Sequence, residues 1–151
     1  MEVEAKFRVP RREIFDELLH MPALGPFVLS PADAMERQIN TYFDTADRRL
    51  AAAGFSLRVR ETGVQRVLTV KRTVSAHDRL RHREEWDVNL ADIKFPREWP
   101  RCEIADQIQA LLDGDVVDPL FQTYTRRWAI AVAGPPPIAE ICLDEGHVRA
   151  A

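Results

Sequence analysis

Short segments in which apolar and charged residues alternate recur along this chain. The first is MEVEAKFRV at 1–9, in which Glu, Lys and Arg occupy even positions and Val, Ala and Phe odd ones. Side chains of a β-strand point alternately to its two faces, so a period of two predicts a strand with one apolar and one charged face. The pattern returns in FSLRVRE at 55–61, RVLTVKR at 66–72 and REEWDV at 83–88. A fold rich in two-faced strands is therefore expected.

Other segments complete the outline. RREIFDELLHM at 11–21 and CEIADQIQALLDG at 102–114 have apolar residues at helical spacing, and ADRRLAAAG at 46–54 predicts a short helix or turn. We interpret PALGPFVLSPADA at 22–34 as a loop and TVSAHDRLRH at 73–82 as a polar connection. Further strand-like segments are QINTYFDT at 38–45, TYTRRWAIAV at 123–132 and IAEICLDEG at 138–146. The outline is about seven strands and two helices, with short links that favour antiparallel pairing.

Composition narrows the class of protein. The 151 residues and 17.3 kDa fit a single domain over 1–151 that is large enough to bury a core. The net charge of −3 argues against nucleic acid as a partner, and no apolar run is long enough for a membrane span. Cys102 and Cys142 match no zinc or disulfide spacing, and the charged N-terminus is not a secretory signal, so we expect a cytoplasmic protein.

The charged strand faces allow two interpretations. A sheet that is wet on one face is common among antiparallel sheets and needs no ligand. Dense Lys and Glu are nevertheless poor strand formers, and the apolar face needs more cover than two helices supply. A sheet curled into a barrel solves this problem, because helices and loops then cover the apolar outside and the charges line the inside. Cations beside carboxylates in one cavity suggest a polyphosphate bridged by Mg²⁺ or Mn²⁺.

The motifs resemble those of a known family. Glu2-x-Glu4-x-Lys6 is similar to the ExExK signature of the CYTH domain, whose members are also called triphosphate tunnel metalloenzymes. Supporting motifs follow in the family's order over nearly the whole chain: TYFDT at 41–45, LRVRE at 57–61, LTVK at 68–71, REEWD at 83–87, TRRW at 125–128 and EICLDEG at 140–146. The resemblance implies an α+β fold with an antiparallel β-barrel, flanked by helices, that binds triphosphate and a divalent metal ion inside.

The resemblance also implies roles for individual residues. Glu85 is expected to orient the attacking water, and Lys6 and Arg58 to act beside it in catalysis. The phosphate-binding residues implied by the family pattern are Lys6, Arg58, Arg60, Lys71, Arg83 and Arg127. The implied ligands for Mg²⁺ or Mn²⁺ are Glu2, Glu4, Asp87, Glu140 and Asp144. The strand phase sets Arg127 inward and Arg126 outward, because Trp128, Ile130 and Val132 form the apolar face.

The sequence departs from the family pattern at two places. Thr125 stands where members often have Lys, so one cation is missing. The pattern also ends at HVRAA, before a last strand rich in glutamates, so we expect a domain that is truncated or lacks that strand. The tunnel is then open along one side, and its strand edges are available to a second copy in a homodimer.

Several functions stay open at this stage. The leading hypothesis is metal-dependent hydrolysis of inorganic triphosphate or a related compound. An adenylate cyclase of the same fold and a non-catalytic module that binds polyphosphate or nucleotide are the alternatives. The purely structural alternative is a barrel whose ions only pair with one another.

Overall fold

The computed structural model describes the backbone of residues 5–30, 34–77, 80–133 and 139–150, and the side chains of the same residues except 74–83. The chain forms two compact units. The first contains Ile39–Tyr124, and the second contains Lys6–Gln38 and Thr125–His147. The single domain expected from the sequence stays a prediction.

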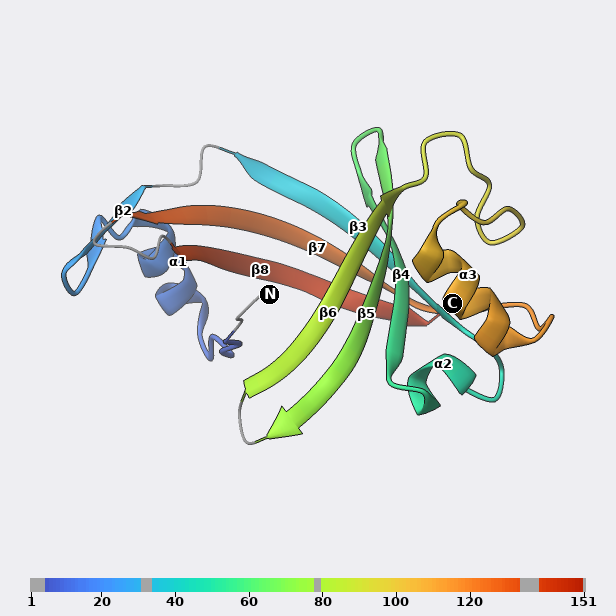
Figure 1. Ribbon diagram of the computed structural model, residues 1–151. Coiled ribbons are helices and arrows are strands. Elements are labelled where there is room, and N and C mark those ends of the chain that lie inside the picture. Colours follow the sequence, from blue (N-terminus) through green and yellow to red (C-terminus); the bar gives the residue numbers. More distant parts are fainter. Residues whose placement is uncertain (1–4, 31–33, 78–79, 134–138, 151) are drawn as a thin grey trace. The chain divides into compact units, whose positions relative to one another are not determined.

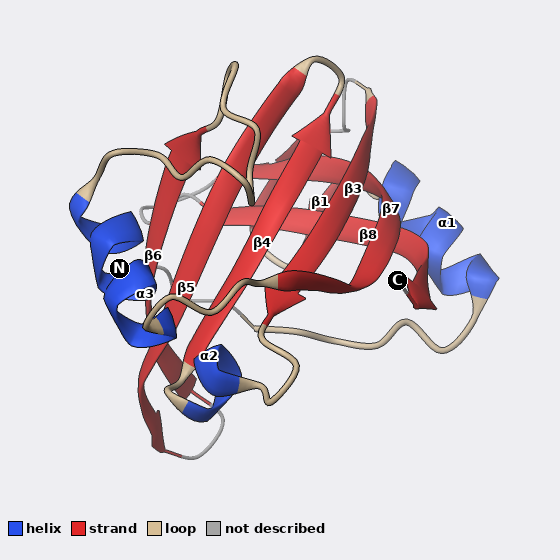
Figure 2. Ribbon diagram, turned by 90° about the vertical axis from the view of Figure 1, so that its right-hand side faces the viewer, coloured by secondary structure: helices blue, strands red, loops and turns tan. Residues whose placement is uncertain are grey.

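The first unit is a set of long antiparallel strands with helices on one face (Figures 1 and 2). Its strands β4, β5 and β6 pair in sequence order, and β3 pairs with β4 on the other side. The elements are α2 (Arg49–Ala52), β4 (Phe55–Thr62), β5 (Gln65–His77), β6 (Leu80–Asn89) and α3 (Glu103–Leu112), with the adjoining parts of β3 (Met35–Asp44) and β7 (Asp118–Ala133).

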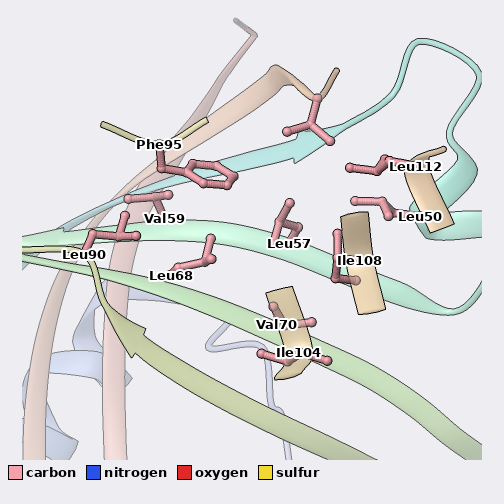
Figure 3. Packing of buried hydrophobic residues seen from close by; sticks show 11 residues of the cluster. Leu50, Leu57, Val59, Leu68, Val70, Leu90, Phe95, Ile104, Ile108 and Leu112 are labelled. Carbon is pink, nitrogen blue, oxygen red and sulfur yellow. The ribbon is translucent and has the colours of Figure 1, made fainter. Parts of the chain in front are cut away.

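A dry core joins the strands of the first unit to its helices. Leu68 and Val70 of β5 are fully buried and pack with Ile108 of α3 and Leu50 of α2 (Figure 3). The apolar residues of α3 recur every four positions and so share one side of the helix. The remaining buried members of this cluster are Leu57, Val59, Leu90, Phe95, Ile104, Leu112 and Val117. The predicted apolar strand face is therefore confirmed, and α2 and α3 cover it.

The second unit is smaller and has its own core. The helix α1 (Arg12–His20) packs on strands β7 and β8 through Phe15, which meets Trp128 edge to face with ring centroids 5.5 Å apart. Leu29, Ile130 and Leu143 are the other buried members of this core. The remaining strands here are β1 (Ala23–Leu24), β2 (Phe27–Ser30) and β8 (Ala139–Ala150).

The strand pairings give an eight-stranded sheet in the order β1-β2-β7-β3-β4-β5-β6, with β8 paired to β7. The registers that are resolved are antiparallel, as predicted. In the described part of the chain no pairing joins the two ends of this order, so the sheet is open, and the order remains compatible with the predicted tunnel. None of the described helices has the length and apolarity needed to cross a membrane.

Three sequence predictions were wrong locally. Residues 5–10 form no strand, although their alternation continues that of residues 1–4, which lie outside the described set. The predicted loop at 22–34 contains the hairpin of β1 and β2, whose turn at Gly25 has a φ of +58°. The predicted connection at 73–82 is mostly strand, because β5 continues to His77 and β6 begins at Leu80. Its polar composition hid two long strand ends that pair with each other.

Candidate functional site

The strand register of the first unit brings the predicted residues of β4, β5 and β6 to one face. Arg58 lies opposite Thr69, and Thr69 lies opposite Asp87. Lys71 lies opposite Glu85 in the neighbouring row. Directly opposed residues of antiparallel strands project to the same side. These five side chains therefore share the face that the helices leave uncovered, as the alternation predicted.

Glu85 holds two partly buried cations on this face. Its carboxylate lies 2.7 Å from Lys71 Nζ and 3.8 Å from Arg58 Nη2. The side chain of Arg58 is 13% exposed, that of Lys71 20% and that of Glu85 26%, so water screens these charges only in part. Asp87 shares this face, so its charges are mixed, and Arg58 and Lys71 are the cations of β4 and β5 here that could contact an anion.

Arg58 also carries an unmet hydrogen-bond donor. Its Nε is buried and has no hydrogen-bond partner among the described residues. A buried donor without a partner costs free energy, and that cost is recovered when an acceptor binds. The planar guanidinium offers several donors in one plane, a geometry that matches the oxygens of a phosphate or carboxylate.

Two neutral residues fix the neighbouring charged side chains. Thr69, only 1% exposed, donates from Oγ1 to Asp87 Oδ1 at 2.6 Å. Asn40, 4% exposed, accepts from Arg60 Nε at 3.2 Å and donates to Thr123 Oγ1 at 3.2 Å. Sequence analysis assigned Asn40 and Thr69 no role. Their position in the alternation of the strand could have identified them, because each lies on the charged face of its strand.

The second unit holds another group of predicted residues. Arg127 donates from Nε and Nη2 to the two oxygens of Asp144, each at 2.7 Å, and this fork raises the pKa of Arg127. On the same strand as Asp144, Cys142 Sγ donates to Glu140 Oε1 at 3.1 Å. Desolvation of the thiol and this hydrogen bond raise the pKa of Cys142 to about 11, although much of the residue is exposed. The thiol is therefore protonated near neutral pH.

The opposite orientation predicted for Arg126 is supported by its partner. Arg126 pairs with Glu145 at 2.7 Å, and Glu145 also pairs with Arg12 of α1 at 2.8 Å. This ion cluster lies at the helix-covered face, whereas Arg127 and Asp144 alternate to the other face. Its members are largely exposed, so it contributes little to stability.

The remaining predicted residues are placed only in part. Lys6 is exposed and lies outside any strand. Glu2 and Glu4 lie outside the described residues, as does the side chain of Arg83. The structure thus brings together Arg58, Lys71 and Glu85 in the first unit and Arg127 and Asp144 in the second.

The predicted metal ligands form no complete site in the described part of the chain. There, no group of three or more His, Cys, Asp and Glu side chains is placed to hold an ion. Asp87 accepts from Thr69, and Asp144 gives both oxygens to Arg127. Carboxylate oxygens are nevertheless the donors that Mg²⁺ and Mn²⁺ prefer, so the chemistry of the predicted set fits such an ion.

Comparisons with known proteins agree with this fold. The model of the CYTH domain family matches residues 1–150. A solved structure from Hippeastrum, described as a candidate adenylyl cyclase with a dominant triphosphatase activity, matches with 21% identity and a TM-score of 0.59 over 93% of this chain and 70% of that one. A candidate adenylate cyclase from Bacillus halodurans matches with 18% identity and a TM-score of 0.53 over 91% of this chain and 75% of that one. At these identities the two structures establish the fold alone.

Proposed function

The chain belongs to the CYTH domain family, and from this premise we propose that it is a metal-dependent enzyme that hydrolyses inorganic triphosphate or a related triphosphate compound. The observation that carries the proposal is the cation pair of Arg58 and Lys71, which lie on the face of β4 and β5 opposite α2 and α3. The activity named for the Hippeastrum protein is consistent with hydrolysis as the leading reaction.

Hydrolysis of a phosphoric anhydride depends mainly on positioning and on charge stabilisation. Arg58 and Lys71 are proposed to hold phosphate oxygens and to stabilise the charge that develops on the leaving phosphate. Arg60, whose Nε is fixed by Asn40, is proposed to bind a further oxygen. Glu85, within reach of both cations, is proposed to orient the attacking water once the phosphate is bound.

The remaining predicted residues enter as separate proposals, each open to its own variant. Lys6, Arg83 and Arg127 are proposed to bind phosphate. A metal ion would be held by the carboxylates of Glu2, Glu4, Asp87, Glu140 and Asp144, with Mg²⁺ and Mn²⁺ as the expected ions. When bound, such an ion neutralises phosphate oxygens and lowers the repulsion between them and the carboxylates.

The decisive experiment compares two arginines of the first unit. Arg58→Ala is expected to lower the rate of phosphate release from triphosphate by about tenfold or more, and Lys6→Ala likewise, with no loss of folded structure. Arg72→Ala is the matched control. The Arg72 side chain is 53% exposed and lies at the opposite phase of β5, 4.0 Å from Glu84, so its removal is expected to leave turnover nearly unchanged. Wild-type turnover in the Arg58 variant would contradict the proposal.

The same assay separates the alternatives. Incubation with ATP and Mg²⁺ yields cyclic AMP and diphosphate if the protein is a cyclase, and inorganic phosphate if it is a hydrolase. Tight binding of triphosphate with no product of either kind would identify a binding module instead.

A further inference from the structure

Within the first unit, Glu85 occupies the place that a bound anion needs. Its two carboxylate oxygens face the two cations that are proposed to bind phosphate, Oε2 facing Lys71 and Oε1 facing Arg58. A phosphate oxygen that contacts both cations must replace this carboxylate or lie beside it as a second negative charge. Both courses cost free energy at side chains that are at most 26% exposed.

Glu85 satisfies the hydrogen-bond donors of Arg58 only partly. It comes no closer than 3.8 Å to Arg58 Nη2, which is beyond hydrogen-bond distance, and the buried Nε of Arg58 has no hydrogen-bond partner in the described part of the chain. With its Oε2 at 2.7 Å from Lys71, the carboxylate leaves its Oε1 at 3.8 Å from Arg58. A polyphosphate is not tethered and has oxygens enough for both cations.

We infer that Glu85 is an internal competitor for anions, so that binding of a polyphosphate is an exchange in which phosphate oxygens replace the Glu85 carboxylate on Lys71 and Arg58. The inference rests on the proposed function, because it concerns the same cations. It adds that this carboxylate sets the affinity of the metal-free protein, and that Glu85 is released from Lys71 only when substrate is bound. An ion pair that merely supports the fold would have the opposite effect, because its loss would weaken the cation positions and lower anion binding.

The test measures binding of inorganic triphosphate by calorimetry in EDTA, with and without the carboxylate. Glu85→Gln keeps the shape of the side chain and removes its charge, and Glu85→Ser removes both, so that either variant is informative if the other folds poorly. Each is expected to bind triphosphate roughly tenfold or more tightly than the wild type, because one negative charge near the anion is removed in a partly buried site. Glu84→Gln is the matched control, since Glu84 is the preceding residue of β6, is 52% exposed and has the opposite phase. The affinity of the Glu84→Gln variant for triphosphate is expected to differ from that of the wild type by less than about threefold.

A measurement on the wild-type protein needs no variant. Nuclear magnetic resonance of the side chains is expected to show the Glu85 carboxyl signal and the Arg58 Nε–H signal shifting together as triphosphate is added without metal. Arg58 Nε should also become protected from solvent exchange, because it gains an acceptor.

The possible outcomes separate the two proposals. Equal or weaker metal-free binding by both Glu85 variants, or a Glu85 carboxyl signal that stays fixed at saturating triphosphate, would overturn the inference and leave the hydrolase intact. If the wild type and all variants fail to bind triphosphate even with Mg²⁺, both proposals fall. Tighter binding by the Glu85 variants, together with no phosphate release from triphosphate by the wild type in Mg²⁺, would support the exchange and contradict the hydrolase.

Discussion

The buried carboxylate of Asp44 offers a quantitative test of how the first unit is held together. Asp44 ends β3 and is 4% exposed. Its Oδ1 accepts from the backbone N–H of Thr45 at 2.8 Å and of Leu50 at 2.9 Å, and its Oδ2 accepts from that of Ala51 at 3.1 Å. These bonds tie the end of the strand to the short helix α2, which supplies the fully buried Leu50 to the core.

The expected cost of Asp44→Ala follows from those three donors. Thr45 and Leu50 are buried, so their N–H groups lose their acceptor without gaining water, whereas Ala51 is exposed and can turn to solvent. A buried donor without a partner costs about 1–3 kcal/mol, so the loss of two should lower the free energy of unfolding by about 2–6 kcal/mol. Asp44→Asn keeps one acceptor oxygen for the Thr45 and Leu50 donors and should lose only about 1 kcal/mol.

Urea unfolding, followed by tryptophan fluorescence, measures these differences. The variants can be compared directly when the free energy of unfolding falls with urea concentration at the same slope in each. Asp47→Ala is the control, because Asp47 is an exposed carboxylate in the same turn, whose pKa is lowered chiefly by a hydrogen bond from the Thr45 hydroxyl. It should lower the free energy of unfolding less than Asp44→Ala does, because water screens an exposed carboxylate. If Asp44→Ala were no more harmful than Asp47→Ala, the assignment of Asp44 as the anchor of α2 would be refuted.

Two further predictions concern a thiol and a turn. Because the pKa of Cys142 is raised to about 11, its thiolate fraction at pH 8 is small, and alkylation by iodoacetamide should be on the order of 100-fold slower than for an ordinary thiol. The rate, followed by mass spectrometry of the Cys142 peptide, should keep rising above pH 9, and a plateau below that pH would contradict the shift. Gly54→Ala should lower the free energy of unfolding by about 1 kcal/mol, because Gly54 has a φ of +80° that a Cβ disfavours. An unchanged urea midpoint would show that the turn relaxes without cost.

Alternation predicted most of the long strands and failed where pairing overrode composition. In β4 the apolar residues fall at one phase, and in β5 the buried Leu68 and Val70 do so, which allowed strand and buried face to be identified. The ends of β5 and β6 are polar, yet they pair with each other across the hairpin, and a propensity argument does not detect such pairing. The hairpin of β1 and β2 was hidden because Gly25 and its neighbouring prolines suggest a loop whether or not strands flank the turn.

The candidate site was predictable where the alternation along a strand determines which face a residue lies on. Arg58, Lys71 and Glu85 were identified from alternation and from the family motifs, and the structure brings them together. Alternation says which face a residue shares but not which partner it meets, because the pairing register is a property of neighbouring strands. The forked bond of Arg127 to Asp144 and the fixing of Arg60 by Asn40 therefore required coordinates of both strands.

The position of the two central cations is coupled to the core on the other side of the sheet. Arg58 lies between Leu57 and Val59, and Lys71 follows Val70, and these three neighbours are at most 3% exposed. A slip of one residue in β4 or β5 would turn the buried aliphatic side chains to the charged face and the cations into the core. The packing of α2 and α3 therefore fixes the register that aligns Lys71 with Glu85. Cations that the fold positions in this way suit the electrostatic catalysis proposed above, because donors already in place need not reorganise when charge develops on a phosphate.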